Sequence, residues 1–210
     1  MGLEISNLPL NADGSLFMGG SHGKYYEAAS KGRVFIQTTT PLGLAIPIYT
    51  ATAPRIALFN PKGSGRNAVL LRLAANRASG VTVAFTAGFM RVVNVGATAA
   101  TGAPVTVFGQ TDPFNALVGG GQASHMLSTA SGTVTTTAGV AGDFFYSLFH
   151  SYAGVDASAI NDNPIVHDFD GAVIVPPGVM VWLAASVASV ALYATSLMWE
   201  EVDITSASSF

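Results

Sequence analysis

Two short stretches carry residue types that perform chemistry in other proteins. Gly19-Gly20-Ser21-His22-Gly23 matches the G-x-S-x-G pattern, in which a strand-turn-helix holds a nucleophilic serine above a parallel sheet. Lys62-Gly63-Ser64-Gly65-Arg66 offers backbone amides that can cradle a phosphate. The chain lacks the alternating helices of a parallel sheet, and a strand rather than a helix follows the second stretch. We therefore predict a turn at the first stretch and a tight hairpin loop at the second.

Carboxylates gather in two further places. His167-Asp168-Phe169-Asp170, with Asp156 and Asp162 nearby, offers oxygen ligands of the kind that Ca²⁺ prefers, but no twelve-residue calcium loop is present. Strand alternation would put the two aspartates of 167–170 on one side and the histidine on the other. Glu200 and Glu201 are strand neighbours that would face opposite ways. The sequence therefore predicts no catalytic residue, no metal site, no cofactor and no enzymatic activity.

Charged residues are scarce along the whole chain. They make up 10% of its 210 residues, against about 25% in ordinary soluble domains. A folded monomer of 21.5 kDa would expose on the order of 9,000 Å², so uncharged side chains must cover most of its surface. Such a surface usually lies partly against another protein. We therefore expect assembly with other subunits and not membrane insertion, and the absence of cysteine excludes disulfides and thiolate metal sites.

The charges are also segregated along the sequence. All nine Lys and Arg residues lie before residue 92 together with three acids, which gives this part a net charge of +6. The remainder holds nine acids and no base, a net charge of −9. The two parts could interleave within one domain, which is the simpler expectation, or form opposite faces that attract a neighbouring subunit. Because the bases are spread out without an aromatic stacking motif, nucleic-acid binding is not expected.

A long uncharged stretch runs from Gly171 to Trp199, and how it folds decides the class of the protein. As one helix it would be long enough to cross a bilayer, for example over Val179–Met198. Pro176-Pro177-Gly178 interrupts it, the residues that follow alternate as in strands, and no basic residue flanks it. We therefore predict two strands, apolar on both faces, that form a closing hairpin with its turn at Ala184–Ser189.

The rest of the chain repeats short β-prone runs between turn signals, with little helix. This pattern predicts an all-β protein with a jelly-roll-like β-sandwich at 31–203, an extended N-terminal arm at 1–30 and a C-terminal tail at 204–210. The arm holds one helical candidate, Lys24–Lys31, and 109–132 is predicted to be a long loop. The predicted strands before the C-terminal pair are Arg33–Thr40, Leu44–Thr50, Arg55–Phe59, Ala68–Ala75, Val81–Val93, Val105–Phe108, Thr133–Val140, Phe144–Phe149, Ile165–Asp168 and Ala172–Val175.

Three motifs resemble those of one class of proteins. Asn60-Pro61-Lys62-Gly63-Ser64-Gly65-Arg66-Asn67 between apolar strands, Pro176-Pro177-Gly178, and the closing Trp199-Glu200-Glu201 are similar to stretches in virion proteins of tailed bacteriophages. The resemblance implies a jelly-roll-like capsid decoration (cement) protein or head fibre without enzymatic activity. The leading hypothesis is therefore a structural protein of the capsid surface, assembled in the host cytoplasm. Its expected partners are the major capsid protein and itself, as a homotrimer.

A second hypothesis belongs to a different class. Jelly rolls also serve as lectins, and aromatic side chains stack on sugars. A carbohydrate- or receptor-binding module of a phage fibre would use residues such as Phe114, Tyr146, His150 and Tyr152. The other two candidate histidines, His22 and His125, have no sequence neighbours that suggest a site.

Overall fold

The computed structural model describes residues 23–49, 54–80, 83–93, 105–108, 110–130, 134–136, 143–151 and 164–204. Its elements in chain order are α1 (Tyr26–Ser30), β1 (Val34–Thr38), β2 (Leu44–Ala45), β3 (Ala57–Asn60), β4 (Arg66–Ser79), β5 (Phe85–Val93), β6 (Val105–Phe108), β7 (Phe114–Asn115), β8 (Leu127–Thr129), β9 (Val134–Thr136), β10 (Asp143–Ser151), β11 (Ile165–Val175), β12 (Val179–Ala185) and β13 (Leu192–Asp203).

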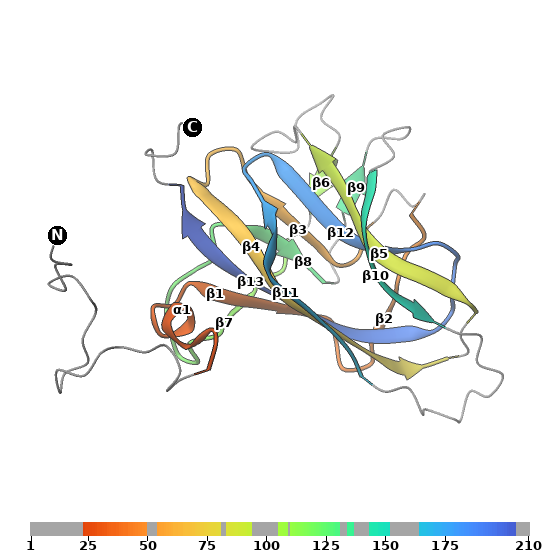
Figure 1. The fold of residues 1–210 in the computed structure, drawn as a ribbon. Helices are drawn as coiled ribbons and strands as arrows, with labels where there is room; N and C mark the ends of the chain where they lie inside the picture. Colours follow the sequence, from red (N-terminus) through yellow and green to blue (C-terminus); the bar gives the residue numbers. More distant parts are fainter. Residues whose placement is uncertain are drawn as a thin grey trace, which may run out of the picture.

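Apart from β6 and β9, which pair with each other, the strands form two antiparallel sheets that pack face to face (Figure 1). The six-stranded sheet has the order β11-β4-β13-β1-β7, with β2 also pairing with β13, and the five-stranded sheet has the order β10-β5-β12-β3-β8. Four strands of each sheet, β1-β13-β4-β11 and β3-β12-β5-β10, follow the order of an eight-stranded jelly roll. The predicted all-β, jelly-roll-like sandwich is thus confirmed.

The main core lies between the sheets because every second residue of the central strands is apolar. Trp199 and Tyr193 of β13 and Phe89 of β5 are buried in it. The rings of Phe85 and Tyr193 meet edge to face at 5.9 Å between centroids and so join the two sheets directly. Full burial of each such side chain stabilises the fold by about 1.5–3 kcal/mol.

The predicted C-terminal hairpin is wrong in its pairing, although both strands exist. β12 lies between β5 and β3 in one sheet, and β13 lies between β4 and β1 in the other. The connection after Ala185 therefore crosses from sheet to sheet. β12 is apolar on both faces because Leu183 faces the main core while Trp182 joins a second buried cluster on the opposite face. Alternation reveals which residues share a face but not which strand lies alongside.

Four further predictions fail, three of them at points where a partner strand overrides local turn signals. β4 continues to Ser79, past the end predicted at Ala75, because β13 pairs with it along its whole length. The predicted 109–132 loop contains β7 and β8. The strands predicted at Ile165–Asp168 and Ala172–Val175 are one strand, β11, interrupted by a bulge at which Asp170 has a φ of 52°. The strand predicted at Leu44–Thr50 is reduced to Leu44–Ala45.

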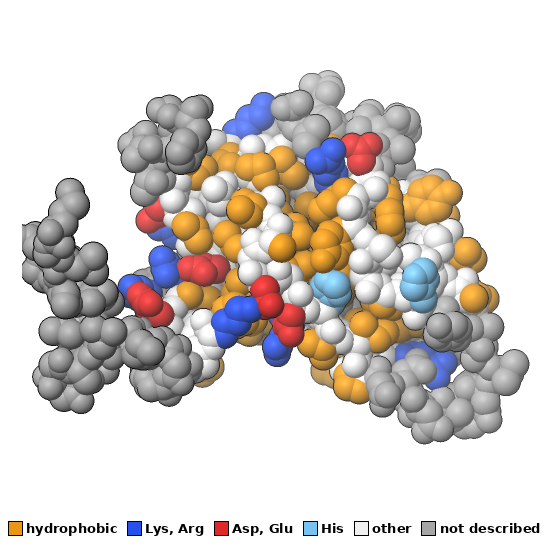
Figure 2. All heavy atoms as spheres, in the orientation of Figure 1, with side chains coloured by type: hydrophobic (Ala, Val, Ile, Leu, Met, Phe, Trp, Pro, Cys, Tyr) orange, Lys and Arg blue, Asp and Glu red, His pale blue; other side chains and the backbone are white. Residues whose placement is uncertain are grey.

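The basic and acidic residues of the two parts of the sequence interleave within one domain, which confirms the simpler of the two expectations. Bases from before residue 92 pair with acids from after it at Lys24–Asp170, Arg33–Glu200, Arg66–Glu201, Arg66–Asp203, Arg72–Asp168 and Arg91–Asp143. In Figure 2 the charged side chains lie in a few groups, and hydrophobic side chains occupy much of the face between them. Basic and acidic residues that are segregated along the sequence therefore neutralise one another in the folded chain.

The helix α1 lies on the outer face of the six-stranded sheet. Ala28 is buried against Val34 of β1 and Leu71 of β4. The rest of the predicted arm, residues 1–22, lies outside the described residues, as do residues 205–210 of the predicted tail. Within the part of the chain that the structure describes, no helix has the length and apolarity needed to span a membrane, and Val179–Met198 forms β12 and the first half of β13.

Candidate subunit-contact surface

The Asn-Pro-Lys-Gly-Ser-Gly motif is a connection between the two sheets and not the predicted hairpin, because β3 and β4 lie in different sheets. Asn60 is completely buried. Its Nδ2 donates to the carbonyl oxygens of Arg66 at 2.7 Å and Val175 at 2.8 Å, and its Oδ1 accepts from Ser64 Oγ at 2.5 Å. One amide side chain therefore closes the loop and ties it to the end of β11.

The Pro-Pro-Gly motif meets the first motif at the same end of the sandwich. Val175, which precedes Pro176, is bound by the Asn60 side chain, and the Gly178 amide donates to the Asn60 carbonyl oxygen at 2.7 Å. Gly178 has a φ of 85°, which L side chains rarely adopt. The two motifs are more than a hundred residues apart and form one structural junction. The Asn60 side chain joins the β3–β4 connection to the β11–β12 connection, each of which runs from one sheet to the other.

Glu201, in the third motif, has a side chain with no exposed surface. It accepts hydrogen bonds from Ser124 Oγ at 2.5 Å and from the His125 amide at 3.0 Å, and His125 Nδ1 lies 3.1 Å from it. Arg66 Nη1, at 3.7 Å, supplies a positive charge. The carboxylate thus fixes residues 124–126 against β13. A Ser-His-Glu nucleophile is not formed, because Ser124 donates to the carboxylate and not to the imidazole.

Asn115 fixes the chain a few residues earlier. Its Nδ2 donates to the Gly32 carbonyl oxygen at 2.9 Å, and its Oδ1 accepts from the Leu117 amide at 2.9 Å. The Ala116 amide donates to the Val34 carbonyl oxygen at 2.9 Å, beside β1. The segment between Asn115 and Ser124 is therefore held at both ends.

Apolar side chains point to solvent along this held segment. Residues 114–121, named here the apolar loop, include Phe114, Leu117 and Val118, which are 67%, 41% and 96% exposed. Beside the apolar loop lies a groove of about 550 Å³, lined by Ile36 and residues 113–123 without a single charged side chain. A rigidly anchored apolar surface of this kind is typical of a protein-binding site, since exposed patches usually mark contacts.

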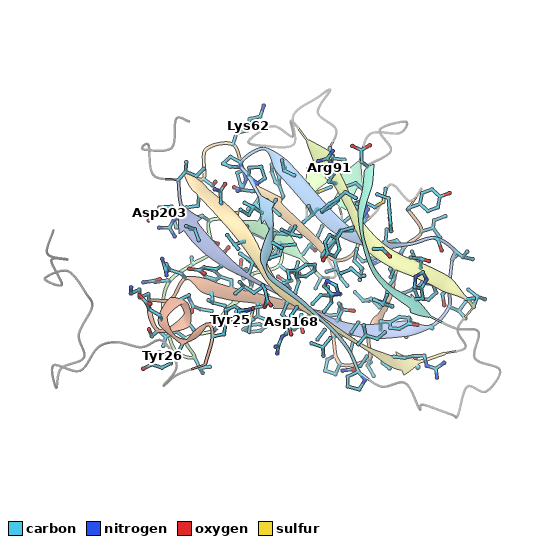
Figure 3. The ribbon with its side chains drawn as sticks, viewed as in Figure 1. Tyr25, Tyr26, Lys62, Arg91, Asp168 and Asp203 are labelled. Carbon is cyan, nitrogen blue, oxygen red and sulfur yellow. The ribbon has the colours of Figure 1, made fainter. Side chains whose placement is uncertain are left out.

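Asp168 and Asp170, the two aspartates of β11, both form ion pairs, and the contacts of Asp170 hold the start of the described chain. Arg72 Nε lies 2.6 Å from Asp168 Oδ1, and Asp170 is bound by the Lys24 ammonium and by the Tyr25 hydroxyl at 3.1 Å. The hydrogen bond from Lys24, followed by that from Tyr25, lowers the pKa of Asp170. Figure 3 shows Tyr25 and Asp168 beside each other on this face. These contacts tie α1 to the sheet edge.

The histidine of the predicted calcium stretch faces the other way, as alternation predicted. His167 contacts Tyr146 and Phe169 on the side opposite the two aspartates. Asp156 and Asp162 lie outside the described residues, and so does most of the G-x-S-x-G stretch. Among the residues that the structure describes, no three His, Asp or Glu side chains come together as metal ligands would.

The candidate sugar-stacking residues are not brought together. Phe114 is on β7, at one edge of the sandwich, and Tyr146 and His150 are on β10, at the other. Tyr146 is engaged with His167, and His150 Nδ1 lies 2.9 Å from Thr86 Oγ1. Tyr152 lies outside the described residues. These residues therefore do not form one platform.

Sequence reasoning missed the residues that organise the surface. His125 and Glu201 are 76 residues apart, and neither has a local signal for its partner. The apolar loop did carry a signal, the Gly119-Gly120-Gly121 run within an unusually long predicted loop. Searches for related proteins found no matching family model, no matching curated protein and no matching solved structure.

Proposed function

We propose that this chain is a structural subunit that binds neighbouring protein subunits through the apolar loop, and that the assembly it stabilises is a bacteriophage capsid. The observation that carries the first part is the anchoring of the loop. Asn115 and Glu201 hold its two ends while Val118 is almost fully exposed. A loop fixed in this way loses little conformational entropy on binding, so that its apolar area contributes to affinity.

Other exposed apolar side chains extend the surface available to partners. Leu42 and Ile174 are 79% and 55% exposed on other parts of the sandwich. A stable interface buries about 1,600 Å² in total, which is more than the apolar loop alone can offer. We propose that the loop is the centre of the contact and that flat, weakly charged strand surfaces surround it.

The capsid part of the proposal rests on the resemblance of the three motifs to stretches in tailed-phage virion proteins. They account for the junction at Asn60 and Gly178 and for the anchor at Glu201. A protein that decorates a capsid needs such a rigid sandwich end and an outward-facing contact loop, and it needs no catalytic group. The jelly-roll fold is compatible with this role but also with others, because fold does not determine function.

Light scattering tests the self-association. The purified chain is expected to be oligomeric, and Val118→Asp to be monomeric or at least ten times weaker in association, since a charge would be buried at the contact. Val190→Asp, at a valine outside the loop that is 78% exposed, is the control and should behave as the wild type. A wild-type chain that remains monomeric at micromolar concentration would contradict self-association.

Co-sedimentation tests the capsid contact separately. Capsids assembled from the major capsid protein encoded in the same genome should carry the wild-type chain and release the Val118→Asp variant. Equal sedimentation of both, or of neither, would count against the apolar loop as the capsid-binding surface.

A further inference from the structure

We propose that the outer face of the five-stranded sheet binds a pyranose sugar, with Phe144 beneath the sugar ring and His150 beside it. Both residues are on β10, which pairs with β5 and lies next to it in Figure 1. The apolar loop belongs to the other sheet, so that this site is separate from the proposed subunit contact. The inference rests on how the Phe144 ring is placed and on which polar groups share its face.

The Phe144 ring lies across the sheet and does not project away from it. Its Cζ and Cε2 atoms fill the space above Gly88, on the neighbouring strand, in which a Cβ would otherwise lie. Phe144 is 48% exposed, as expected of a ring that has one face against the backbone and the other toward water. Because Gly88 has no side chain, an aromatic ring can rest there, and it forms a half-exposed platform on β5.

The alternation of β5 places this platform on the face opposite the main core. Phe89 is buried in the main core, and Met90 belongs to the second buried cluster on the other face. Because successive side chains of a strand point to opposite faces, Thr86 and Gly88 share the face of Met90. His150 pairs with Thr86, and its Nδ1 lies 2.9 Å from Thr86 Oγ1. The imidazole therefore stands on the same face as the aromatic ring over Gly88.

The spacing between the platform and the imidazole suits one sugar ring. Two residues of β5 separate Gly88 from Thr86, which places them about 7 Å apart along the strand, close to the width of a pyranose. His150 is exposed, and its contact with Thr86 fixes the imidazole at Nδ1, so that Nε2 can bind a sugar hydroxyl. Ser147, also exposed, pairs with Gly88 and offers a hydroxyl for a second contact.

The chemistry of a pyranose matches this arrangement. One face of the sugar carries C–H bonds whose partial positive charge is attracted by the negative face of an aromatic ring, while hydroxyls surround its rim. The exposed apolar area at the site is limited to one ring, because Met90 beside it is buried. A stable protein interface buries about 1,600 Å² in total, which one aromatic ring cannot provide. The site therefore suits a small ligand with one apolar face better than a protein partner.

Titration with simple sugars, followed by NMR of the full-length chain, tests the inference. Methyl β-D-galactopyranoside and methyl β-D-glucopyranoside are the probes, and glucitol, which has the hydroxyls but no closed ring, is the control. At least one pyranoside should shift the amide signals of Gly88, Ser147 and His150, and its own ring protons should move upfield over the Phe144 ring. Glucitol should do neither. The absence of these shifts with both pyranosides, or equal shifts with glucitol, would overturn the inference.

Three variants locate the sugar. Phe144→Leu keeps an apolar cover over Gly88 and removes the aromatic face, so that the dissociation constant should rise about tenfold. His150→Ala removes one hydrogen bond and should raise it about three- to tenfold. Tyr26→Leu removes an aromatic side chain of similar exposure on α1, on the other sheet, and is the matched control that should leave it unchanged. Wild-type affinity in Phe144→Leu would overturn the stacking, and wild-type affinity in His150→Ala would remove His150 from the site.

A fourth variant keeps the stacking testable if circular dichroism shows that Phe144→Leu does not fold. Phe144→Trp retains an aromatic face at the same position and should bind the pyranoside at least as tightly as the wild type. Loss of the sugar-induced shifts in a folded Phe144→Trp variant would contradict the stacking. Val118→Asp should bind the sugar as the wild type does, so that failure of this site leaves the proposed subunit contact standing.

Discussion

The Tyr146 hydroxyl lies 3.1 Å from His167 Nε2, and this contact joins the edge strands of the two sheets. Tyr146 is on β10, at the end of the five-stranded sheet, and His167 is on β11, at the corresponding end of the six-stranded sheet. Their rings also meet edge to face, with centroids 5.4 Å apart. The pair closes the side of the sandwich at which α1 begins, since Asp170 lies three residues further along β11.

Tyr146→Phe should lower the free energy of unfolding by about 1 kcal/mol, because it removes one part-buried hydrogen bond and keeps the ring contacts. Urea denaturation measures the change. Tyr49→Phe is the control at a half-exposed tyrosine and should change the stability by less than about 0.5 kcal/mol. Equal effects of the two substitutions would show that the hydrogen bond between Tyr146 and His167 contributes nothing to stability.

Asn60→Ala should cost about 2–3 kcal/mol in the free energy of unfolding, since it leaves the carbonyl oxygens of Arg66 and Val175 without their shared donor. Asn76→Ala, at an exposed asparagine of β4, is the control and should be nearly neutral. The comparison is made by thermal or urea unfolding. An Asn60→Ala variant as stable as the control would contradict the junction between the two motifs.

Glu201→Gln keeps the shape of the buried side chain and removes its charge. We expect a loss of about 2–3 kcal/mol and faster hydrogen exchange at the amides of His125 and Met126, which face the carboxylate. Glu200→Gln, on the opposite face of the same strand, loses a partly exposed pair with Arg33 and should cost about 0–1 kcal/mol. Unchanged exchange at residues 125–126 would disprove the anchoring of the loop.

The contact between Lys24 and Asp170 should weaken in acid. The hydrogen bonds from Lys24 and Tyr25 lower the pKa of Asp170 from its ordinary value of 3.8. A lowered pKa means that the contact stabilises the fold above pH 3.8 and that this stabilisation is lost as the pH falls through the lowered pKa. In Lys24→Met the Asp170 pKa should move back towards 3.8, as followed by carboxyl NMR. Lys62→Met should not move it, and a shift common to both would refute the contact.

Gly88 of β5 lies under the first bulge of β10. A Cβ at this position would overlap the carbonyl oxygen of Tyr146 and the ring of Phe144. Gly88→Ala should therefore displace β10 and cost about 1–3 kcal/mol, as overpacked sites usually do. Gly63→Ala has open space around it and should be neutral or slightly stabilising. The measurement compares the melting temperatures of the two variants. Equal values would contradict the close approach of β5 and β10 at Gly88.

Local patterns in the amino-acid sequence were enough to predict an all-β protein and most of its strands. β-prone runs between turn signals predicted β1, β5 and β10 close to where they lie, and alternation predicted β12, because both signals are local. The Pro176-Pro177-Gly178 break separated β11 from β12 for the same reason: proline and glycine restrict or free the backbone wherever they occur. The placement of Asp168 and Asp170 opposite His167 also followed from alternation alone.

The pairing of the strands and the contacts between distant polar groups could not be predicted in this way and are known from the folded chain alone. β12 and β13 look alike in sequence and enter different sheets, because pairing depends on what lies beside a strand and not on its own pattern. Glu201 anchors residues 124–126 because Ser124 and the His125 amide, which are distant in sequence, bind its carboxylate. Hydrogen-bond partners and buried charges depend on contacts between distant segments of the folded chain. The local periodicity of the sequence therefore does not predict them.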